Sequence, residues 1–350
     1  MKKVLLFAAA ALIAVPLGAQ EVERISGRSV AVYNLAGHVE VVRGSGSDVV
    51  VRISRGGGDA SELSVQTGQI RGRSTLRVIY PDDEISYREM GRGSSTSMSV
   101  RDDGTFSDGG DGHGDRVRIR GNGSGLEAWA DLVIEVPAGK DFAVYLAAGE
   151  VEATGVEADV LIDTGSGRVR ATDIVGTLDI DTGSGGVVVR GVDGDLRVDT
   201  GSGGVEVSEV VGREIEIDTG SGGVSGVGLD AAVLSVDTGS GSIELESVTS
   251  SEILLDTGSG SIDIELMTDV TRLDADTGSG SITVRAPSDL GAEVEIETGS
   301  GGIDLDFAIE VRSVRRNHVT GTIGDGRGEI EIDTGSGAVR LIRTGGGLIR

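Results

Sequence analysis

The sequence predicts an all-β protein built as a parallel β-solenoid, and three observations support this fold class. The pentapeptide DTGSG occurs eight times at nearly constant spacing. Apolar and polar residues alternate on both sides of each copy, which is the pattern of half-buried strands. Glycine contributes 59 of the 350 residues, whereas Phe, Tyr and Trp contribute 4, 4 and 1. A thin coil with many turns and little room for rings accounts for that composition.

The first twenty residues have the layout of a secretory signal peptide. Lys2 and Lys3 precede an apolar stretch, Val4–Val15, which is too short to span a membrane. Small and turn-forming residues follow, so we expect cleavage after Ala19 or Gln20. The mature chain is then exported to the periplasm, the cell surface or the medium, with no transmembrane segment left.

We expect three further regions along the chain. Residues 21–88 contain strand-like runs and form a β cap or the start of the solenoid, in which Asn34–Val39 has the form of a diverged turn followed by a strand. Residues 89–125 are rich in Gly, Ser and Asp and are predicted to be a flexible loop, although a strand pattern resumes at Val117–Ile119. Residues 126–350 form the repeat solenoid.

The repeat itself defines the rungs of the predicted solenoid. The eight DTGSG copies begin at Asp163, Asp181, Asp199, Asp218, Asp237, Asp256, Asp276 and Asp333, and a ninth copy reads ETGSG from Glu297. Successive copies are 18 to 21 residues apart except for one step of 36, where we expect His318–Ile323 to supply a degenerate rung. Tyr145–Gly149 lies one period before the first copy and resembles a worn first rung. The total is about eleven rungs.

Each rung is predicted to consist of two short strands joined by the glycine-rich turn. Leu196 and Val198 alternate with polar residues before one turn, and Val205 and Val207 alternate with polar residues after it. Stacking such rungs about 4.8 Å apart places the apolar side chains in continuous internal ladders. We expect a right-handed coil, following the general rule for parallel crossovers.

The first glycine of each turn is a predicted structural residue. We expect these glycines to supply positive φ angles at the corner without steric strain. They are Gly165, Gly183, Gly201, Gly220, Gly239, Gly258, Gly278, Gly299 and Gly335.

Stacking also predicts a column of aspartates, which is the one candidate metal site. Like charges about 5 Å apart repel by about 1 kcal/mol per pair in water. The carboxylates therefore extend into solvent, accept hydrogen bonds from the turn, or bind Ca²⁺, which prefers oxygen ligands. The candidate Ca²⁺ ligands are Asp163, Asp181, Asp199, Asp218, Asp237, Asp256 and Asp276. No other cofactor is expected.

Several functional classes find little support in the sequence. The net charge of −26 disfavours nucleic acid as a partner, and the lack of cysteine excludes disulfides and thiol catalysis. DTGS also surrounds the catalytic aspartate of aspartic proteases, but those enzymes oppose two carboxylates across a cleft, whereas a stack places them in a row. Polysaccharide-degrading β-helices need a cluster of carboxylates and usually aromatic subsites, and neither is distinguishable.

The remaining candidate residues are isolated ones. His38, His113 and His318 are scattered along the sequence, which argues against a histidine metal site or a Ser-His-Asp triad. Trp129 precedes a strand and is expected to be a partly buried cap residue. Gly109–Asp115 resembles a single calcium-binding nonapeptide, but its Asp is one place late and no second copy follows.

The array resembles the bacterial DUF4097 family of β-strand-repeat proteins, which are described as candidate adhesins. The repeated IDTGSG units carry the resemblance, together with Asp131–Gly139 and the C-terminal segments Glu295–Leu305 and Ile332–Gly337. The likeness covers about residues 28–342. It implies a β-solenoid and no defined catalytic residues.

These observations predict an exported, non-enzymatic structural or adhesin-like protein. Its ladder faces would present repeated side chains for multivalent contacts with an envelope, cell-surface or glycan ligand. The alternatives are a periplasmic, envelope-associated binding or scaffold protein and, with less support, a carbohydrate-active β-helix enzyme.

Overall fold

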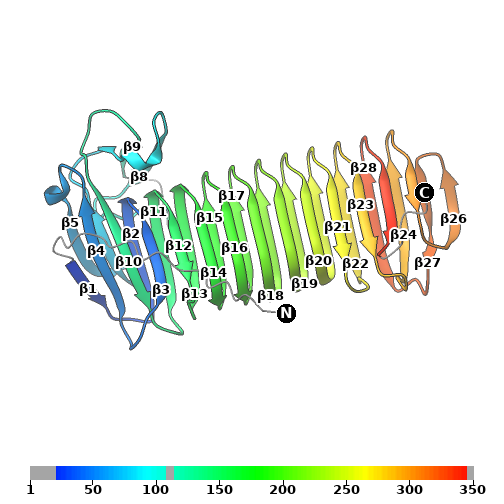
Figure 1. Ribbon diagram of the computed structural model, residues 1–350, viewed down its shortest axis with the longest axis horizontal. Coiled ribbons are helices and arrows are strands. Elements are labelled where there is room, and N and C mark those ends of the chain that lie inside the picture. The colour runs from blue at the N-terminus through cyan, green and yellow to red at the C-terminus, as the bar shows by residue number, and fades with distance from the viewer. Residues whose placement is uncertain (1–20, 108–113, 345–350) are drawn as a thin grey trace, which may run out of the picture.

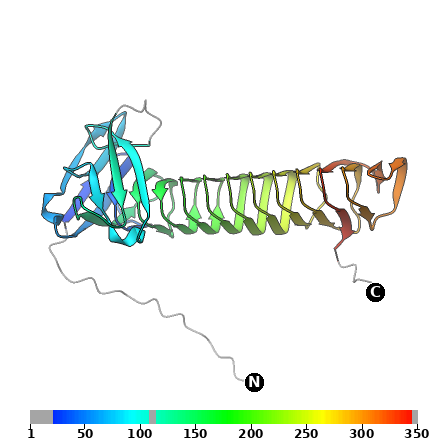
Figure 2. The same cartoon turned by 90° about the horizontal axis from the view of Figure 1, so that it is seen from above.

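The computed structural model describes residues 21–107 and 114–344. The predicted signal peptide and most of the nonapeptide-like segment lie outside these residues. Figure 1 shows a long stack of strands that begins in a wider N-terminal lobe, and Figure 2 shows that the lobe projects to one side of the stack.

The N-terminal lobe is made of strands and two short 3-10 helices that surround the first rungs. Its elements are β1 (Glu21–Ile25), β4 (Val49–Gly56), η1 (Ala60–Glu62), β5 (Ser64–Ile70), β6 (Arg73–Ile79), β7 (Glu84–Ser86), η2 (Arg88–Met90), β8 (Ser95–Val100), β9 (Asp115–Arg120) and β10 (Trp129–Val136).

The rungs follow, each with one strand on either side of the glycine-rich turn. In chain order their strands are β2 (Ser29–Ala36), β3 (Val39–Arg43), β11 (Asp141–Ala148), β12 (Val151–Thr154), β13 (Asp159–Ser166), β14 (Val169–Val175), β15 (Leu178–Thr182), β16 (Val187–Asp193), β17 (Leu196–Thr200), β18 (Val205–Thr219), β19 (Val224–Thr238), β20 (Ile243–Thr257), β21 (Ile262–Leu266), β22 (Arg272–Thr277), β23 (Ile282–Ala286), β24 (Ala292–Thr298), β25 (Ile303–Leu305), β28 (Gly328–Thr334) and β29 (Val339–Arg343). A hairpin of β26 (Ile309–Arg315) and β27 (His318–Ile323) closes the far end.

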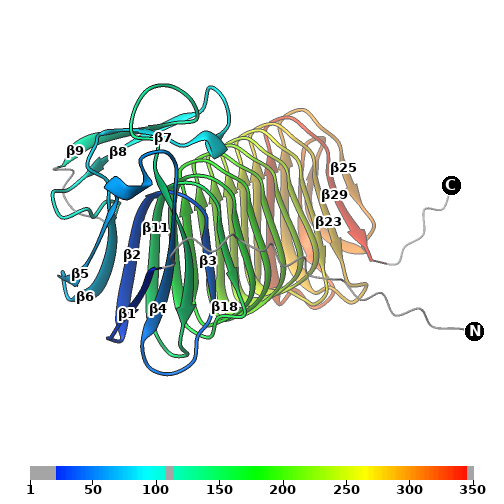
Figure 3. The same cartoon turned by 60° about the vertical axis from the view of Figure 1, so that its left-hand side comes forward.

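The rungs stack in parallel, with one register shift between β20 and β21 after Leu245, which confirms the predicted β-solenoid. Each turn residue lies beside the equivalent residue of the next rung, and the described chain contains eleven such positions. In stacking order they are Asn34, Leu146, Thr164, Thr182, Thr200, Thr219, Thr238, Thr257, Thr277, Thr334 and Thr298. Asn34 belongs to the diverged turn and Leu146 to the worn rung expected from the sequence. Figure 3 looks obliquely along the stack and shows the coils superposed.

The last rungs are not stacked in chain order, which corrects one prediction. His318–Ile323 is not a degenerate rung: as β27 it runs antiparallel to β24 and β26 outside the stack. After β23 the chain passes to the terminal rung, makes the hairpin, and returns to insert β28 between β22 and β24. Figure 1 shows this inversion as red β28 between yellow β22 and orange β24.

The segment expected to be a flexible loop also contains ordered structure. β8 and β9 lie within residues 89–125 and pair in antiparallel fashion, and β7 adds to β9 in parallel. The strand predicted at Val117–Ile119 is therefore part of a small second sheet. Its apolar residues Val117 and Ile119 pack onto Tyr33 and Tyr145 of the first rungs, and that packing is what orders a polar, glycine-rich segment.

The core consists of aliphatic ladders that run the length of the coil. One ladder contains Leu178, Leu196, Ile215, Leu234, Ile253, Leu273, Ile330 and Val294, each at most 4% exposed. The facing strands contribute a second ladder in which Val187, Val205 and Val224 are in register. No rung could bury these side chains by itself, so stacking supplies the hydrophobic stabilisation.

The turn glycines are needed because neighbouring rungs approach closely. The first glycine of a DTGSG copy does not have the positive φ predicted for it. Within these copies, the glycines with positive φ are second glycines: Gly167, Gly185 and Gly203. A Cβ on Gly201 would instead lie 2.7 Å from the carbonyl oxygen of Gly183, and one on Gly220 would lie 2.7 Å from that of Gly201. The first glycine of each copy is therefore required because the neighbouring backbone leaves no room for a Cβ atom, and not because its φ angle is positive.

A buried threonine ladder joins the turns. Six threonine hydroxyls donate to the carbonyl of the second glycine in the neighbouring turn: Thr219, Thr238, Thr257, Thr277, Thr298 and Thr334. Thr164 donates to the hydroxyl of Thr182 at 2.9 Å, and the buried hydroxyl of Thr200 has no partner among the described residues. The threonine hydroxyls of one ladder therefore have three different environments.

This difference gives a matched pair of substitutions. Thr238→Val removes the hydrogen bond to Gly222, which is 2.9 Å long, and is expected to cost about 1 kcal/mol of stability. Thr200→Val replaces an unsatisfied buried hydroxyl with a methyl group and is expected to leave the thermal midpoint unchanged or raise it. Thermal unfolding of the two variants measures this difference in stability. Equal losses of stability would contradict the different environments assigned to the two hydroxyls.

Candidate binding face

A straight row of carboxylates occupies one face of the solenoid, immediately before the turns. In stacking order the row contains Asp163, Asp181, Asp199, Asp218, Asp237, Asp256, Asp276, Asp333 and Glu297. The strands hold them there because each is one residue from a buried threonine and so points outward. The row predicted from the repeat therefore exists, and the inversion of the last two rungs keeps it continuous.

Most of these carboxylates extend into solvent. Asp181, Asp199, Asp218, Asp237 and Asp256 are exposed. For these five, the described residues provide no hydrogen bond from the turn and no ion pair. The backbone alone therefore holds these five carboxylates in line, and their charges face outward.

Repulsion and burial raise the pKa of several members of the row. Burial is the larger cause for Asp181, and the neighbouring carboxylates of Asp199 and Asp179 add to it. The pKa values of Asp218, Asp237, Asp276 and Asp333 are raised for the same two reasons. At neutral pH the folded state therefore holds charges that are less favourable than in the unfolded chain.

Mild acidification is expected to stabilise the protein. A carboxyl group whose pKa is higher in the folded state binds protons preferentially there, so stability rises as pH falls from 7 through the raised pKa values towards about 4. We expect the thermal midpoint to be higher near pH 5 than at pH 7. The triple variant Asp218→Asn, Asp237→Asn, Asp256→Asn should show a smaller rise, and an equal rise would show that other groups are responsible.

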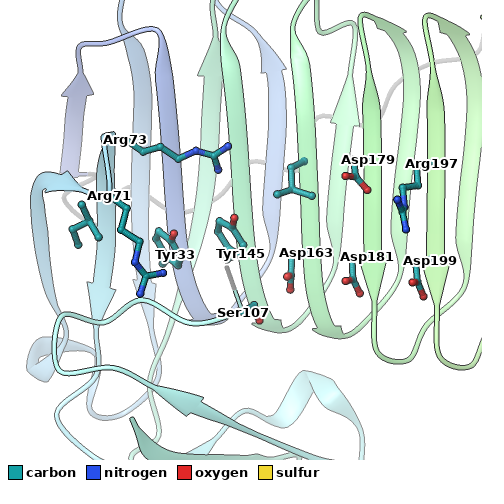
Figure 4. Close-up of a pocket in the computed structure, with 12 residues that line it drawn as sticks. Tyr33, Arg71, Arg73, Ser107, Tyr145, Asp163, Asp179, Asp181, Arg197 and Asp199 are labelled. Carbon is teal, nitrogen blue, oxygen red and sulfur yellow. The ribbon is translucent and has the colours of Figure 1, made fainter. Parts of the chain in front are cut away.

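The row begins at a cavity where the N-terminal lobe meets the first rungs. This cavity has a volume of about 480 Å³ and is lined by Arg71 and Arg73 as well as by Asp163, Asp181 and Asp199. Figure 4 shows the three carboxylates in line, with the two arginines beyond them. Arg73 lies 3.4 Å from the carboxylate of Asp141. Arg197 also lines the cavity, beside Asp179 on the carboxylate side, so cationic and anionic side chains share the same space.

Two tyrosines continue the column of carboxylates into the lobe. Tyr33 and Tyr145 occupy the same register position as Asp163, and their rings stack 4.5 Å apart. Phe106 packs edge-on against both rings. The sequence marks the position of Tyr145 by its spacing of 18 residues from Asp163, but the cluster with Phe106 depends on tertiary structure.

The other candidate residues do not converge on a catalytic or metal site. The backbone N–H of His38 donates to Asp131, and the ring of His318 lies 3.4 Å from Glu297 at the end of the row. His113 is outside the described residues. Trp129 is half-buried and packs against Tyr87, with ring centroids 5.9 Å apart. Across residues 21–107 and 114–344, no group of three or more His, Cys, Asp or Glu side chains is arranged to hold a metal ion.

Comparison with known proteins identifies the family. The family model described as Toastrack DUF4097 matches residues 131–341. The chain belongs to the Toastrack family. The match starts on β10 and contains every DTGSG turn, so the resemblance noted in the sequence is confirmed over residues 131–341. The expected likeness from about residue 28 to residue 130 is not part of the match.

Other comparisons add little to the Toastrack assignment. A proposed cell adhesion protein from Clostridium sporogenes is similar at 10% identity over 93% of this chain and 99% of that one, with a TM-score of 0.19. A TM-score of that size does not establish a common fold. No curated protein matches the chain significantly. Within the described residues, no helix is long and apolar enough to cross a membrane.

Proposed function

We propose that this Toastrack protein is exported and acts without catalysis, as an adhesin-like solenoid that binds ligands through many repeated, weak contacts. The observation that supports the proposal is the row of outward-facing carboxylates, which repeats one chemical group in register along the face. Such a row suits a partner that presents regularly spaced cationic or hydrogen-bonding groups, because the second and later contacts form at high effective concentration. Export rests on the predicted signal peptide.

Binding by the row is testable with charge-matched variants. Neutralising Asp218, Asp237 and Asp256 to Asn removes three adjacent charges from the row. Neutralising Glu152, Glu244 and Glu246 to Gln removes three exposed charges outside it. We expect only the first variant to weaken retention on peptidoglycan, glycan or matrix surfaces, by about tenfold or more because multivalent contacts multiply. Equal effects would show that net charge, rather than the row, determines binding.

Calcium binding by the row stays a prediction with a direct test. A cation that binds only the folded state raises the thermal midpoint in proportion to the logarithm of its concentration. We expect a rise on adding Ca²⁺ that EDTA reverses and that Asp218→Asn, Asp237→Asn, Asp256→Asn reduces. An unchanged midpoint would rule out a stabilising calcium ladder.

The alternative functions make different predictions. A periplasmic, envelope-associated scaffold should remain with the envelope fraction and bind peptidoglycan rather than host matrix. A carbohydrate-active enzyme should turn over a polysaccharide and lose that turnover on a single carboxylate substitution. Such a loss would refute the non-enzymatic proposal.

A further inference from the structure

The last strand of the sheet that carries the carboxylate row has a free edge. This sheet ends in the order β24, β27, β26, and β26 pairs with no other described strand. Figure 1 shows β26 as the outermost strand at the C-terminal end of the stack. Val311 and Val314 on β26 are 51% and 63% exposed, and Val314 is the most exposed large apolar side chain of the described residues. A free, valine-bearing edge of this kind can pair with another strand.

A β-bulge in β26 places both valines on the inner face of the sheet. The register with β27 shifts between Val311 and Ser313, so Arg312 is an extra residue in the strand. In a regular strand Val311 and Val314 would point to opposite faces, because they are three residues apart. With the bulge they lie opposite two alternate residues of β27 that are both buried. The inner face of the sheet therefore continues onto β26, where no further described strand follows.

Glu310 and Arg315 share the outer face of the same strand. They lie opposite Thr322 and His318, which alternate with the buried residues of β27. Both side chains are exposed, and neither forms an ion pair within the described part of the chain. Arg312, by contrast, already forms an ion pair with a glutamate of β24. One free carboxylate and one free guanidinium are therefore available to a partner at this edge.

The segment 310–315 is complementary to a second copy of itself in antiparallel pairing. A two-fold axis between Arg312 and Ser313 places Val311 of one copy opposite Val314 of the other. The same register places Glu310 of one copy opposite Arg315 of the other, and the axis repeats each contact. Directly opposite residues of an antiparallel pair lie on one face. The bulge satisfies this condition, since both valines lie on the inner face and both free charges lie on the outer face.

We propose that two copies of this protein associate through β26, edge to edge, as a two-fold dimer joined at the C-terminal ends of the solenoids. Backbone hydrogen bonds between the two edges supply the affinity, and the valine and charge pairs set the register. Charges and bulges commonly protect an edge from pairing, but here they fit a second copy of the same strand. The contact uses the β26 edge of both copies, so it closes at the dimer. This inference does not depend on the proposed function.

Sedimentation velocity of the purified protein over a range of concentrations tests this dimer. We expect a monomer–dimer equilibrium with no larger species. Glu310→Arg and Arg315→Glu should each weaken self-association by about tenfold, because both attractive cross-strand pairs become repulsive. An equimolar mixture of these two variants should associate again, since every arginine then lies opposite a glutamate. The double variant Glu310→Arg, Arg315→Glu should also dimerise, for the same reason.

Matched substitutions on β1, the edge strand at the other end of the solenoid, provide the controls. Val314→Lys should abolish dimerisation, whereas Val22→Lys, at a position 48% exposed, should leave it unchanged. Arg24→Glu makes the same charge change as Arg315→Glu and should also have no effect. Wild-type thermal midpoints would show that these variants are folded.

Four outcomes would overturn the proposal. The first is a protein that stays monomeric at every concentration, and the second is association that survives Val314→Lys. The third is a mixture of Glu310→Arg and Arg315→Glu that associates no better than either variant alone. The fourth is growth beyond the dimer, which would mean that an edge other than β26 makes the contact.

Discussion

Val205→Asp is expected to lower the stability of the solenoid by about 4 kcal/mol, because it places an unpaired carboxylate in the aliphatic core. Val205 is 2% exposed and stacks between Val187 and Val224 on the inner face. Neither neighbouring rung offers a donor or a cation at that position. The charge must therefore be neutralised at a cost or brought to the surface by opening the rung.

The control is an exposed valine on the next rung. Val227 is 48% exposed, so Val227→Asp should change stability by less than about 1 kcal/mol despite carrying the same new charge. Thermal unfolding followed by circular dichroism compares the two variants. A similar small loss in both would contradict the inner face assigned to Val205.

Gly222→Ala is expected to destabilise the stack by about 3 kcal/mol, because one methyl group would collide with the backbone of the preceding turn. A Cβ at Gly222 would lie 2.1 Å from the carbonyl oxygen of Gly203, which is far inside contact distance. The two rungs would have to move apart to remove this collision. The hydrogen bond from the Gly203 N–H to the Ser221 carbonyl, 3.1 Å long, connects these turns and would be strained.

The adjacent glycine provides the control for this substitution. A Cβ at Gly223 would meet its nearest atom, the carbonyl oxygen of Ser242, at 3.5 Å, which is ordinary contact. The chain itself places serine at the equivalent position of later turns, as at Ser242 and Ser261. Gly223→Ala should therefore retain the wild-type thermal midpoint within about 0.5 kcal/mol. Equal losses for Gly222→Ala and Gly223→Ala would mean that glycine flexibility, not close packing, explains the turn.

The sequence carries enough local information to predict one rung well. Period-two alternation around DTGSG identifies the strands, the buried ladder and the outward aspartate, because each depends only on residues within a single repeat. The diverged rungs at Asn34 and Tyr145 could also be found, since spacing survives where the motif does not.

Features that join distant segments were not predictable in the same way. β8 and β9 lie in a segment whose composition indicates a loop, and they become strands by packing on Tyr33 and Tyr145. The cavity at the start of the carboxylate row likewise needs the β5–β6 hairpin, whose Arg71 and Arg73 are far from the repeat in sequence. No pattern within residues 64–79 points to that contact.

By itself the sequence determined the structure of a single rung, because the residues of each repeat define its strands, its turn and its buried positions. Only the tertiary structure decided the order of the last rungs, in which the copy at Asp333 stacks between those at Asp276 and Glu297. All rungs present nearly the same hydrogen-bonding edge, so one rung can replace another without changing the local pairing. The non-repeating β26–β27 hairpin determines the order of the last rungs, because β27 pairs with β24 and makes that rung the end of the stack.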